Sequence, residues 1–401
     1  MASQLITFFL SFALFAGMAF LSYNEASLLL DPYNVVWRRR EMPKAAWAIE
    51  QLRSAEIEHL AKQPDIYDTL IVADSRGSWG NIREVNRVTN SRLFSLNASG
   101  DTPIGWLPKI RWAVQTQTKL RRIILYLSIG QFQVAPQRDL LLFHEHPYVT
   151  GESWLSYYWT FSNLPYQTFL RSAGYYMQRI AGLSKDSATI INSGFDEETG
   201  ELTLFGQSYP QFVPTDEDRA KFQSLVSSDP PERLRFHDSI YGSADLATLL
   251  KDRPIREDQV TSFIELLQVI RANGLQAECV VTPTPIAGLR LTPSKFYLEW
   301  MHLVVQHCGA IWDFSLPAPI TGDNYNFRDM DHFLPYVSKM ILVRVLGGEL
   351  PELRKYPDFG VQVLAREFET YHDRWERAMM CWERSAFGGD DRRCSTPFVN
   401  R

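Results

Sequence analysis

The sequence predicts an α/β fold, a three-layer sandwich with a mainly parallel sheet, and two observations support this prediction. Four short apolar runs are rich in β-forming residues and do not alternate with polar ones, which is typical of strands buried on both faces of a parallel sheet. Helical patterns lie between the runs, as they do when helices connect parallel strands. The four runs are residues 68–73, 121–130, 276–285 and 309–315.

Three helices of this fold are predicted from periodicity and end signals. Residues 103–120 have a helical pattern and precede the second apolar run. Residues 257–274 place their apolar side chains on one stripe and end at a glycine, which is a common way for a helix to stop. Residues 292–309 begin with Thr-Pro and end with Gly, as helices with proline first and glycine last do.

The chain divides into four predicted parts: an apolar N-terminal segment (1–24), a helical linker (25–65), the α/β domain (66–356) and a C-terminal helix and tail (357–401). Within the domain, residues 131–257 interrupt the alternation of strands and helices, and we interpret them as an insertion of helices, with a hairpin as a further candidate element, over one end of the sheet. The tail is predicted to form one long amphipathic helix whose aromatic stripe is a docking surface, with a partner protein as one possible occupant. That stripe consists of Phe368, Tyr371, Trp375, Met379 and Trp382.

Composition narrows the function classes. The 401 residues carry a formal net charge of −5, which provides no basic field for a phosphate backbone, so nucleic-acid binding is not expected. No glycine-rich phosphate loop precedes a predicted helix, so we expect no dinucleotide cofactor. Residues 144–146 (His-Glu-His) place two imidazoles at alternate positions, but no third ligand is visible nearby, and we expect no metal.

The N-terminal segment is predicted to anchor the chain in a membrane. Residues 1–24 contain no charged side chain, and the apolar run Leu5–Leu21 has 17 residues, at the short end of what a membrane-spanning helix needs. A cleaved signal peptide is the main alternative, because Gly17 and Ala19 form a small-x-small site. A buried core helix is the second alternative. The absence of Lys and Arg from this segment favours an uncleaved signal anchor.

The side of the membrane on which the body lies is predicted from two opposing signals. The basic run 38–40 favours a cytoplasmic body, although it lies near the limit of the range over which loop charge sets orientation. Cys381 and Cys394 lie 13 residues apart across a polar loop and are a plausible disulfide pair, which favours an oxidising compartment. Cys279 and Cys308 are interpreted as buried free thiols beside apolar strands. We expect a body on the extracytoplasmic, periplasmic side of an inner membrane.

Two segments contain residue types suited to nucleophilic catalysis. The first apolar run ends at Asp74-Ser75-Arg76-Gly77, which can supply a turn and a helix cap or can present a nucleophilic serine. A serine needs a base, usually a histidine oriented by a carboxylate. His332 follows Asp329 by three residues and precedes an apolar helical pattern. The alternative is that an aspartate here only caps the helix and that His332 is a surface residue.

A serine after an early strand, together with a late D-x-x-H, resembles the pattern of the SGNH (GDSL-like) hydrolase superfamily. The matching residues are 73–76 (Ala-Asp-Ser-Arg) and 329–332 (Asp-Met-Asp-His). More locally, the chain looks like poorly characterised membrane-anchored bacterial members of that superfamily. Further counterparts are residues 31–33 (Asp-Pro-Tyr), 97–100 (Asn-Ala-Ser-Gly), 329–333 and 358–361 (Asp-Phe-Gly-Val). The resemblance covers most of the chain after residue 25 and implies a flavodoxin-like sheet.

The resemblance also implies roles. Ser75 would be the nucleophile, His332 the general base and then acid, and Asp329 the carboxylate that orients the histidine. Oxyanion donors would be the backbone N–H of Ser75 or Arg76, a group at Asn97 or Gly100, and the side chain of Gln131. The last of these departs from the pattern, because the superfamily has an asparagine in its third block and residues 127–133 offer only Gly130 and Gln131.

The implied function is a membrane-anchored serine esterase or O-acyltransferase that acts on acyl esters, such as acetyl esters, of an envelope or exported polysaccharide. Its partners would be an acylated polysaccharide or a small acyl ester, and aromatic residues within 153–166 could stack on sugar rings or belong to the core. The alternative is a non-catalytic relative that binds glycan or scaffolds polysaccharide assembly. A third possibility is an anchored α/β domain in which the Asp-Ser and Asp-His pairs are only helix caps.

Overall fold

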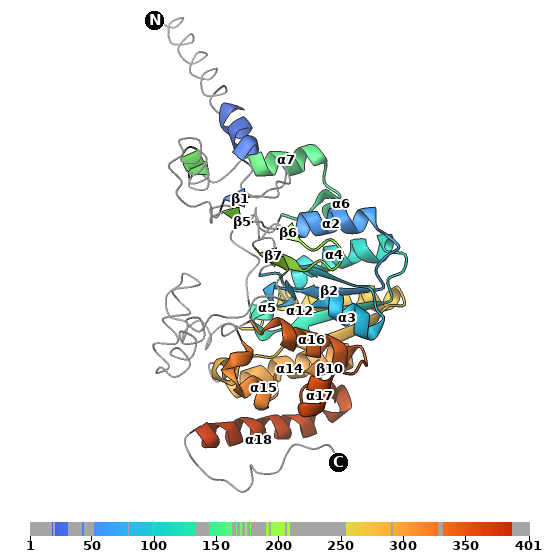
Figure 1. Ribbon diagram of the computed structural model, residues 1–401, viewed down its shortest axis with the longest axis vertical. Coiled ribbons are helices and arrows are strands. Elements are labelled where there is room, and N and C mark those ends of the chain that lie inside the picture. The colour runs from blue at the N-terminus through green and yellow to red at the C-terminus, as the bar shows by residue number, and fades with distance from the viewer. Residues whose placement is uncertain are drawn as a thin grey trace, which may run out of the picture. The chain divides into compact units, whose positions relative to one another are not determined.

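The computed structural model describes two compact units of the chain (Figure 1). The described residues are 52–133 without 79 and 99, 144–162, 194–204, 254–327 without 290 and 291, and 332–386, together with short stretches within 18–43 and 166–208. The larger unit comprises 60–137, 196–202 and 208–401, and the smaller unit comprises 1–59, 138–195 and 203–207.

A six-stranded sheet forms the centre of the larger unit, and it confirms the predicted α/β class with a mostly parallel sheet. The strand order is β11-β10-β9-β4-β2-β3, in which only β11 is antiparallel to its neighbour. The four predicted runs appear as β2 (Thr69–Ala73), β4 (Arg122–Leu127), β9 (Gln276–Val281) and β10 (Ala310–Asp313). Sequence reasoning missed the two edge strands, β3 (Leu93–Asn97) and β11 (Val361–Leu364).

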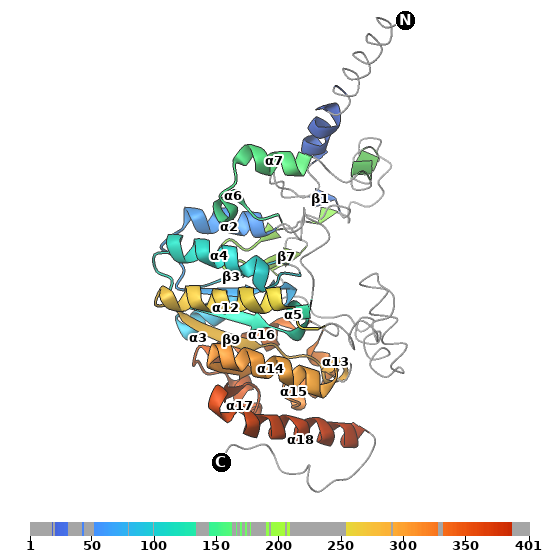
Figure 2. The same ribbon diagram turned by 180° about the vertical axis from the view of Figure 1, so that it is seen from behind.

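Helices cover both faces of this sheet. Figure 2 shows α4 (Pro103–Thr116), α12 (Glu257–Ala272) and α14 (Ser294–Cys308) side by side over one face. The other face is covered by α3 (Ile82–Thr89) and α16 (Pro335–Val345) (Figure 1). These two helices pack against each other and contribute to a cluster of buried apolar side chains on that face. The three helices predicted at 103–120, 257–274 and 292–309 are therefore present.

Short elements fill the connections of the larger unit. They are η2 (Ser75–Ser78), α5 (Ile129–Gln133), α13 (Ile286–Leu289), α15 (Pro319–Gly322), η5 (Asn324–Asn326), α17 (Pro351–Lys355) and η6 (Ala365–Glu367). Because parallel strands end at one edge, η2 and α5 follow the carboxyl ends of the neighbouring strands β2 and β4. This edge carries the predicted site.

The smaller unit contains a helix over residues 21–30, most of α2 (Leu52–Lys62), α6 (Pro147–Thr150) and α7 (Trp154–Ser162). A buried ion pair joins Arg53 of α2 to Glu145 at 2.7 Å, and the hydroxyls of Ser54 and Tyr157 share a 2.6 Å hydrogen bond. Two small sheets are also described, one of β1 (Met42–Pro43) with β5 (Ile190–Ile191), the other of β6 (Gly194–Phe195), β7 (Leu202–Leu204) and β8 (Gln207–Ser208). The described part of the predicted insertion thus contains both helices and short strands.

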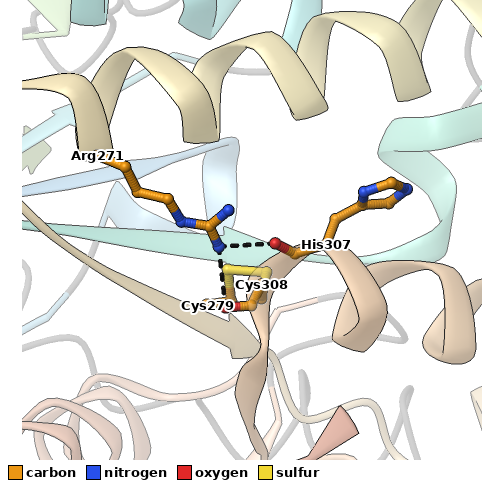
Figure 3. Close-up of a disulfide and its surroundings, with 4 residues drawn as sticks. All are labelled: Arg271, Cys279, His307 and Cys308. Carbon is orange, nitrogen blue, oxygen red and sulfur yellow. Dashed lines mark hydrogen bonds between the residues drawn. A yellow bond between two sulfur atoms is a disulfide. The ribbon is translucent and has the colours of Figure 1, made fainter.

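The interpretation of Cys279 and Cys308 as free thiols is wrong, because the two form a disulfide (Figure 3). They lie 29 residues apart, and the packing of α14 beside β9 brings their Cα atoms to 6.4 Å. Arg271 at the end of α12 donates to the carbonyl oxygens of His307 and Cys308 at 2.7 and 3.0 Å, which satisfies the C-terminus of α14. Cys381 is also disulfide-bonded, while Cys394, its predicted partner, lies outside the described residues.

The C-terminal helix α18 (Phe368–Ala386) docks its aromatic stripe on the chain's own larger unit. The ring of Trp375 stacks on Tyr297 of α14 at 5.4 Å between centroids, and Phe368 stacks on His302 at 4.8 Å. Trp382 lies so close to Gly322 that a Cβ atom there would stand 2.2 Å from the indole ring. The apolar face is thus buried within the chain, and partner binding by this helix stays a prediction.

Among the residues that the structure describes, no helix is both long enough and apolar enough to cross a bilayer. The predicted anchor, Leu5–Leu21, lies outside those residues except for Met18 and Leu21.

Candidate active site

A tight turn presents Ser75 at the carboxyl end of β2. The Asp74 carboxylate accepts from the backbone N–H of Arg76 at 2.9 Å, and the Asp74 carbonyl accepts from the N–H of Gly77 at 3.0 Å. Gly77 is required sterically, since a Cβ atom there would lie 2.4 Å from that of Ala73. Asp74 therefore caps the turn, and this capping leaves the adjacent Ser75 hydroxyl partly exposed at the sheet edge.

The structure brings Ser75 and His332 together across 257 residues of sequence. The Ser75 Oγ and His332 Nε2 atoms are 2.8 Å apart, within hydrogen-bonding distance. His332 lies just before α16 in a loop that is anchored on both sides. Phe327 and Phe333 form a β-bridge and are buried, and the N–H of Leu334 donates to the Asn326 carbonyl at 2.9 Å. The imidazole is thus supported by packed neighbours.

The Ser75 hydroxyl can donate to His332 in only one tautomer of the neutral imidazole. For the Ser75 hydroxyl to donate to Nε2, that nitrogen must be unprotonated and the proton of a neutral imidazole must reside on Nδ1. Asp329, predicted to orient Nδ1, lies outside the described residues. The described part of the site is therefore a serine–histidine pair.

Arg76 places a positive charge beside the nucleophile. Its guanidinium is 2.7 Å from the Asp74 carboxylate and donates to the Ser128 hydroxyl at 2.5 Å, so it connects the ends of β2 and β4. Its backbone N–H, one of the predicted oxyanion donors, is already donated to Asp74. Ser75 is the first residue of η2, and the N–H groups of a first helical turn have no acceptor within the helix. The Ser75 N–H is therefore the better placed of the two donors.

Both polar atoms of the Gln131 side-chain amide are hydrogen-bonded to backbone groups at the end of β4 and in the connection to α5. The side-chain oxygen accepts from the N–H of Ser128 at 2.9 Å, and the side-chain nitrogen donates to the Tyr126 carbonyl at 3.2 Å. Both interactions are buried and hold α5 against the end of β4. A Cβ atom at Gly130 would meet nothing within 4 Å, so space is open at the residue next to Gln131. In this arrangement Gln131 is a structural residue.

The two predicted oxyanion donors at and after the end of β3, Asn97 and Gly100, lie in different environments. Asn97 is buried at the end of β3, and its amide donates to the Ser95 hydroxyl at 3.0 Å. That hydroxyl in turn donates to the Gly77 carbonyl at 2.9 Å, so Asn97 supports the turn that presents Ser75. Gly100 lies in the exposed turn that follows, with a left-handed φ of 65°.

Glu201 supports the start of α3, which follows this turn, and sequence reasoning missed it. Its two carboxylate oxygens accept from the backbone N–H groups of Gly80 and Ile82 at 2.8 and 2.9 Å, which caps the start of α3. Gly200 has a φ of 72°, and a Cβ atom there would stand 2.2 Å from the Ser95 carbonyl. Burial raises the pKa of Glu201 from its ordinary value, and these hydrogen bonds partly oppose that shift. The only sequence signal was a glycine beside an acidic residue in a polar turn.

Asp313 is a second buried carboxylate that sequence reasoning missed, at the carboxyl end of β10. The backbone N–H and the hydroxyl of Ser315 donate to one oxygen at 2.8 and 2.6 Å, and the Tyr371 hydroxyl donates to the other. Tyr297 donates to the Ser315 hydroxyl at 2.6 Å. Burial raises the pKa of Asp313, and burial together with the Asp313 charge raises that of Tyr297. This network ties β10, α14 and α18 together.

The His-Glu-His sequence at 144–146 has structural contacts. His144 lies 2.7 Å from Glu152, Glu145 pairs with Arg53, and His146 accepts from the N–H of Tyr148 at 3.2 Å. Within the part of the chain that the structure describes, no group of three or more metal-ligating side chains gathers.

Comparison of the chain with protein-family models and with curated protein sequences finds no match. The functional conclusion therefore depends on the geometry of the site.

Proposed function

We propose that this protein is a membrane-anchored serine esterase or O-acyltransferase of the SGNH type, and the observation that carries the proposal is the 2.8 Å contact between Ser75 Oγ and His332 Nε2. A buried strand, a capped turn and an anchored loop hold these two side chains at one sheet edge. Such convergence of a hydroxyl and an imidazole suits nucleophilic catalysis.

The proposed reaction transfers an acyl group through the serine. As the Ser75 oxygen attacks the acyl carbonyl carbon, its proton passes to His332 Nε2, and the carbonyl electron pair moves onto oxygen. Collapse of this intermediate breaks the ester C–O bond, and His332 returns the proton to the departing alcohol. Water or a sugar hydroxyl then attacks the acyl-serine with His332 again as base. The products are a carboxylic acid or a new ester, together with free Ser75.

Stabilisation of the oxyanion is the weakest part of the proposed site. The Ser75 N–H is suitably placed at the first position of η2, whereas the Arg76 N–H and the Gln131 amide are bonded elsewhere. Loss of one such donor typically costs about 10²–10³ in rate. We therefore expect slow turnover on simple esters.

A fluorophosphonate probe tests the proposal, because it labels an activated serine without needing the natural acyl group. The full chain should be labelled, and Ser75→Ala and His332→Ala should abolish or strongly reduce labelling. Ser153→Ala and His302→Ala, at surface positions outside the site, serve as matched controls and should be labelled as the wild type is. Labelling that persists in Ser75→Ala would contradict the proposal.

A second candidate function is glycan binding without catalysis, and the engaged Gln131 amide favours it. It predicts binding of acetylated polysaccharide that survives Ser75→Ala, with no release of acetate from any acetylated glycan. The Cys279–Cys308 disulfide supports an extracytoplasmic location under either function, since such bonds persist in oxidising compartments.

A further inference from the structure

The helix α7 exposes large apolar side chains to solvent. Leu155 is 79% exposed, Trp159 is 51% exposed and Trp154 is 40% exposed, while Tyr157 and Phe161 face inward and are buried. Residues 153–170 contain no charged side chain. Neighbouring exposed apolar residues of this size, with no charge among them, usually mark an interaction surface.

This surface is tied directly to the end of the apolar N-terminal run. The Ser162 hydroxyl at the end of α7 donates to the Asn24 side chain at 2.8 Å in a buried contact, and the rings of Tyr23 and Phe169 lie 4.6 Å apart. Tyr23 and Asn24 belong to the helix over 21–30, which starts where the run Leu5–Leu21 ends in the sequence. The end of α7 therefore packs against residues that directly follow the predicted anchor, within the smaller unit.

The Ser162–Asn24 contact limits how far the exposed face of α7 can lie from the end of the apolar run. Seven residues separate Leu155 from Ser162 and three separate Asn24 from Leu21, so the two helical stretches together span at most about 15 Å. Headgroup layers are about 5–8 Å thick on each side of the hydrocarbon core. Trp and Tyr are enriched in such layers, because an apolar ring with a polar edge suits both environments.

We infer that the exposed face of α7, formed by Trp154, Leu155 and Trp159, docks on the bilayer surface beside the anchor and holds the smaller unit against the membrane. Leu155, the most exposed of the three, has no ring for stacking on a sugar, which favours lipid over glycan. α7 carries no Lys or Arg, so the attachment should depend on apolar contact and should be insensitive to salt and to anionic lipid. The inference rests on the proposed membrane anchoring and is independent of the proposed catalysis.

Site-directed spin labelling of the full chain in phosphatidylcholine vesicles tests the inference. Leu155→Cys and, separately, Trp159→Cys place a nitroxide on the exposed face. Glu349→Cys provides a matched exposed control, because Glu349 is 82% exposed in a surface ion pair. Cys279, Cys308 and Cys381 are disulfide-bonded and should not compete, and the chain without an introduced cysteine, treated in the same way, reports any labelling of Cys394. Power saturation then compares access of oxygen, which concentrates in lipid, with access of a water-soluble nickel chelate.

The ratio of oxygen access to nickel access should be several-fold higher at 155 and 159 than at 349, in both low and high salt. Equal ratios at all three positions would overturn the inference while leaving the anchoring intact. Exclusion of both reagents at 155, or dipolar broadening between labels, would indicate a protein partner or a second copy and would also overturn it. Failure of the chain to float with the vesicles would overturn both the inference and the anchoring. Fluorophosphonate labelling of Ser75 on the same samples reports separately on catalysis.

Discussion

Replacement of Gln131 by Ala tests whether its side-chain amide has a structural or a catalytic role. The wild-type side chain satisfies two buried backbone groups, the N–H of Ser128 and the carbonyl of Tyr126. Alanine leaves both without these partners, and an unsatisfied buried backbone group costs about 1–3 kcal/mol. Allowing for partial relaxation and entry of water, we expect a loss of about 2–4 kcal/mol in the free energy of unfolding.

Urea unfolding measures this loss, and fluorophosphonate labelling under folding conditions measures the effect on the nucleophile. Because the amide is bonded to the backbone, the labelling rate should change by less than a few-fold. Gln117→Ala provides a matched control, since buried Gln117 donates one hydrogen bond, to the Leu60 carbonyl at 2.9 Å. It should lose much less stability, because the Leu60 carbonyl also accepts from the N–H of Gln63 at 3.1 Å.

The opposite result would refute this reasoning. If Gln131→Ala unfolded at the wild-type urea concentration while labelling fell by about 10²–10³, Gln131 would be an oxyanion donor, as the resemblance implied. In that case its amide must leave the backbone when substrate binds.

Three further predictions concern groups that hold the larger unit together. Glu201→Ala should lower the free energy of unfolding by about 1–3 kcal/mol and slow the labelling of Ser75, because two N–H groups at the start of α3 lose their acceptor. Urea unfolding and labelling kinetics measure these two effects, and a variant as stable as the wild type would contradict the prediction. Burial raises the pKa of Asp313 above 3.8, so its stabilising contribution is present below that pH and is lost as pH rises through the folded-state pKa. In urea unfolding the wild type should therefore lose stability relative to Asp313→Asn as pH rises from about 4 toward 7, and a pH-independent difference would contradict the assignment. Loss of the Cys279–Cys308 disulfide, whose cysteines lie 29 residues apart, should cost about 3–4 kcal/mol, so Cys279→Ser should be less stable than the wild type by this amount in urea without reductant. Because reductant also cuts the disulfide of Cys381, it should lower the stability of Cys279→Ser by less than that of the wild type, and equal losses would contradict the assignment.

The central strands could be predicted because they are buried on both faces and are therefore almost entirely apolar. β3 could not, since it contains Ser95 and ends at Asn97, which normally suggest a turn. Both residues are buried because they hydrogen-bond to the turn after β2 and to each other. Only the folded arrangement shows that these polar groups have partners. The same holds for Cys279 and Cys308, whose spacing contains no sign that α14 returns to β9.

Within the site, the sequence pointed to Ser75 and His332 through the resemblance of their motifs to a hydrolase pattern, whereas the spacing of Asp329 and His332 alone also allowed a helix cap. It was uninformative about which donors are available, since that depends on the orientation of single side chains. Gln131 could face a substrate or the backbone from the same position, and the local hydrogen bonds decide between them. Glu201 was missed because it lies in a polar stretch far in sequence from the helix start that it caps.

The supports around Ser75 bear on whether the site is active. A simple cap needs only the Asp74 carboxylate, yet this turn is also held by Ser95 and, through the start of α3, by Glu201. Additional supports of this kind are expected where the position of one side chain matters. With few free oxyanion donors, however, turnover would be slow and steady-state assays could miss it. Covalent labelling requires only one attack by Ser75 on the probe, so it can distinguish a slow enzyme, which His332→Ala silences, from a binding protein that never reacts.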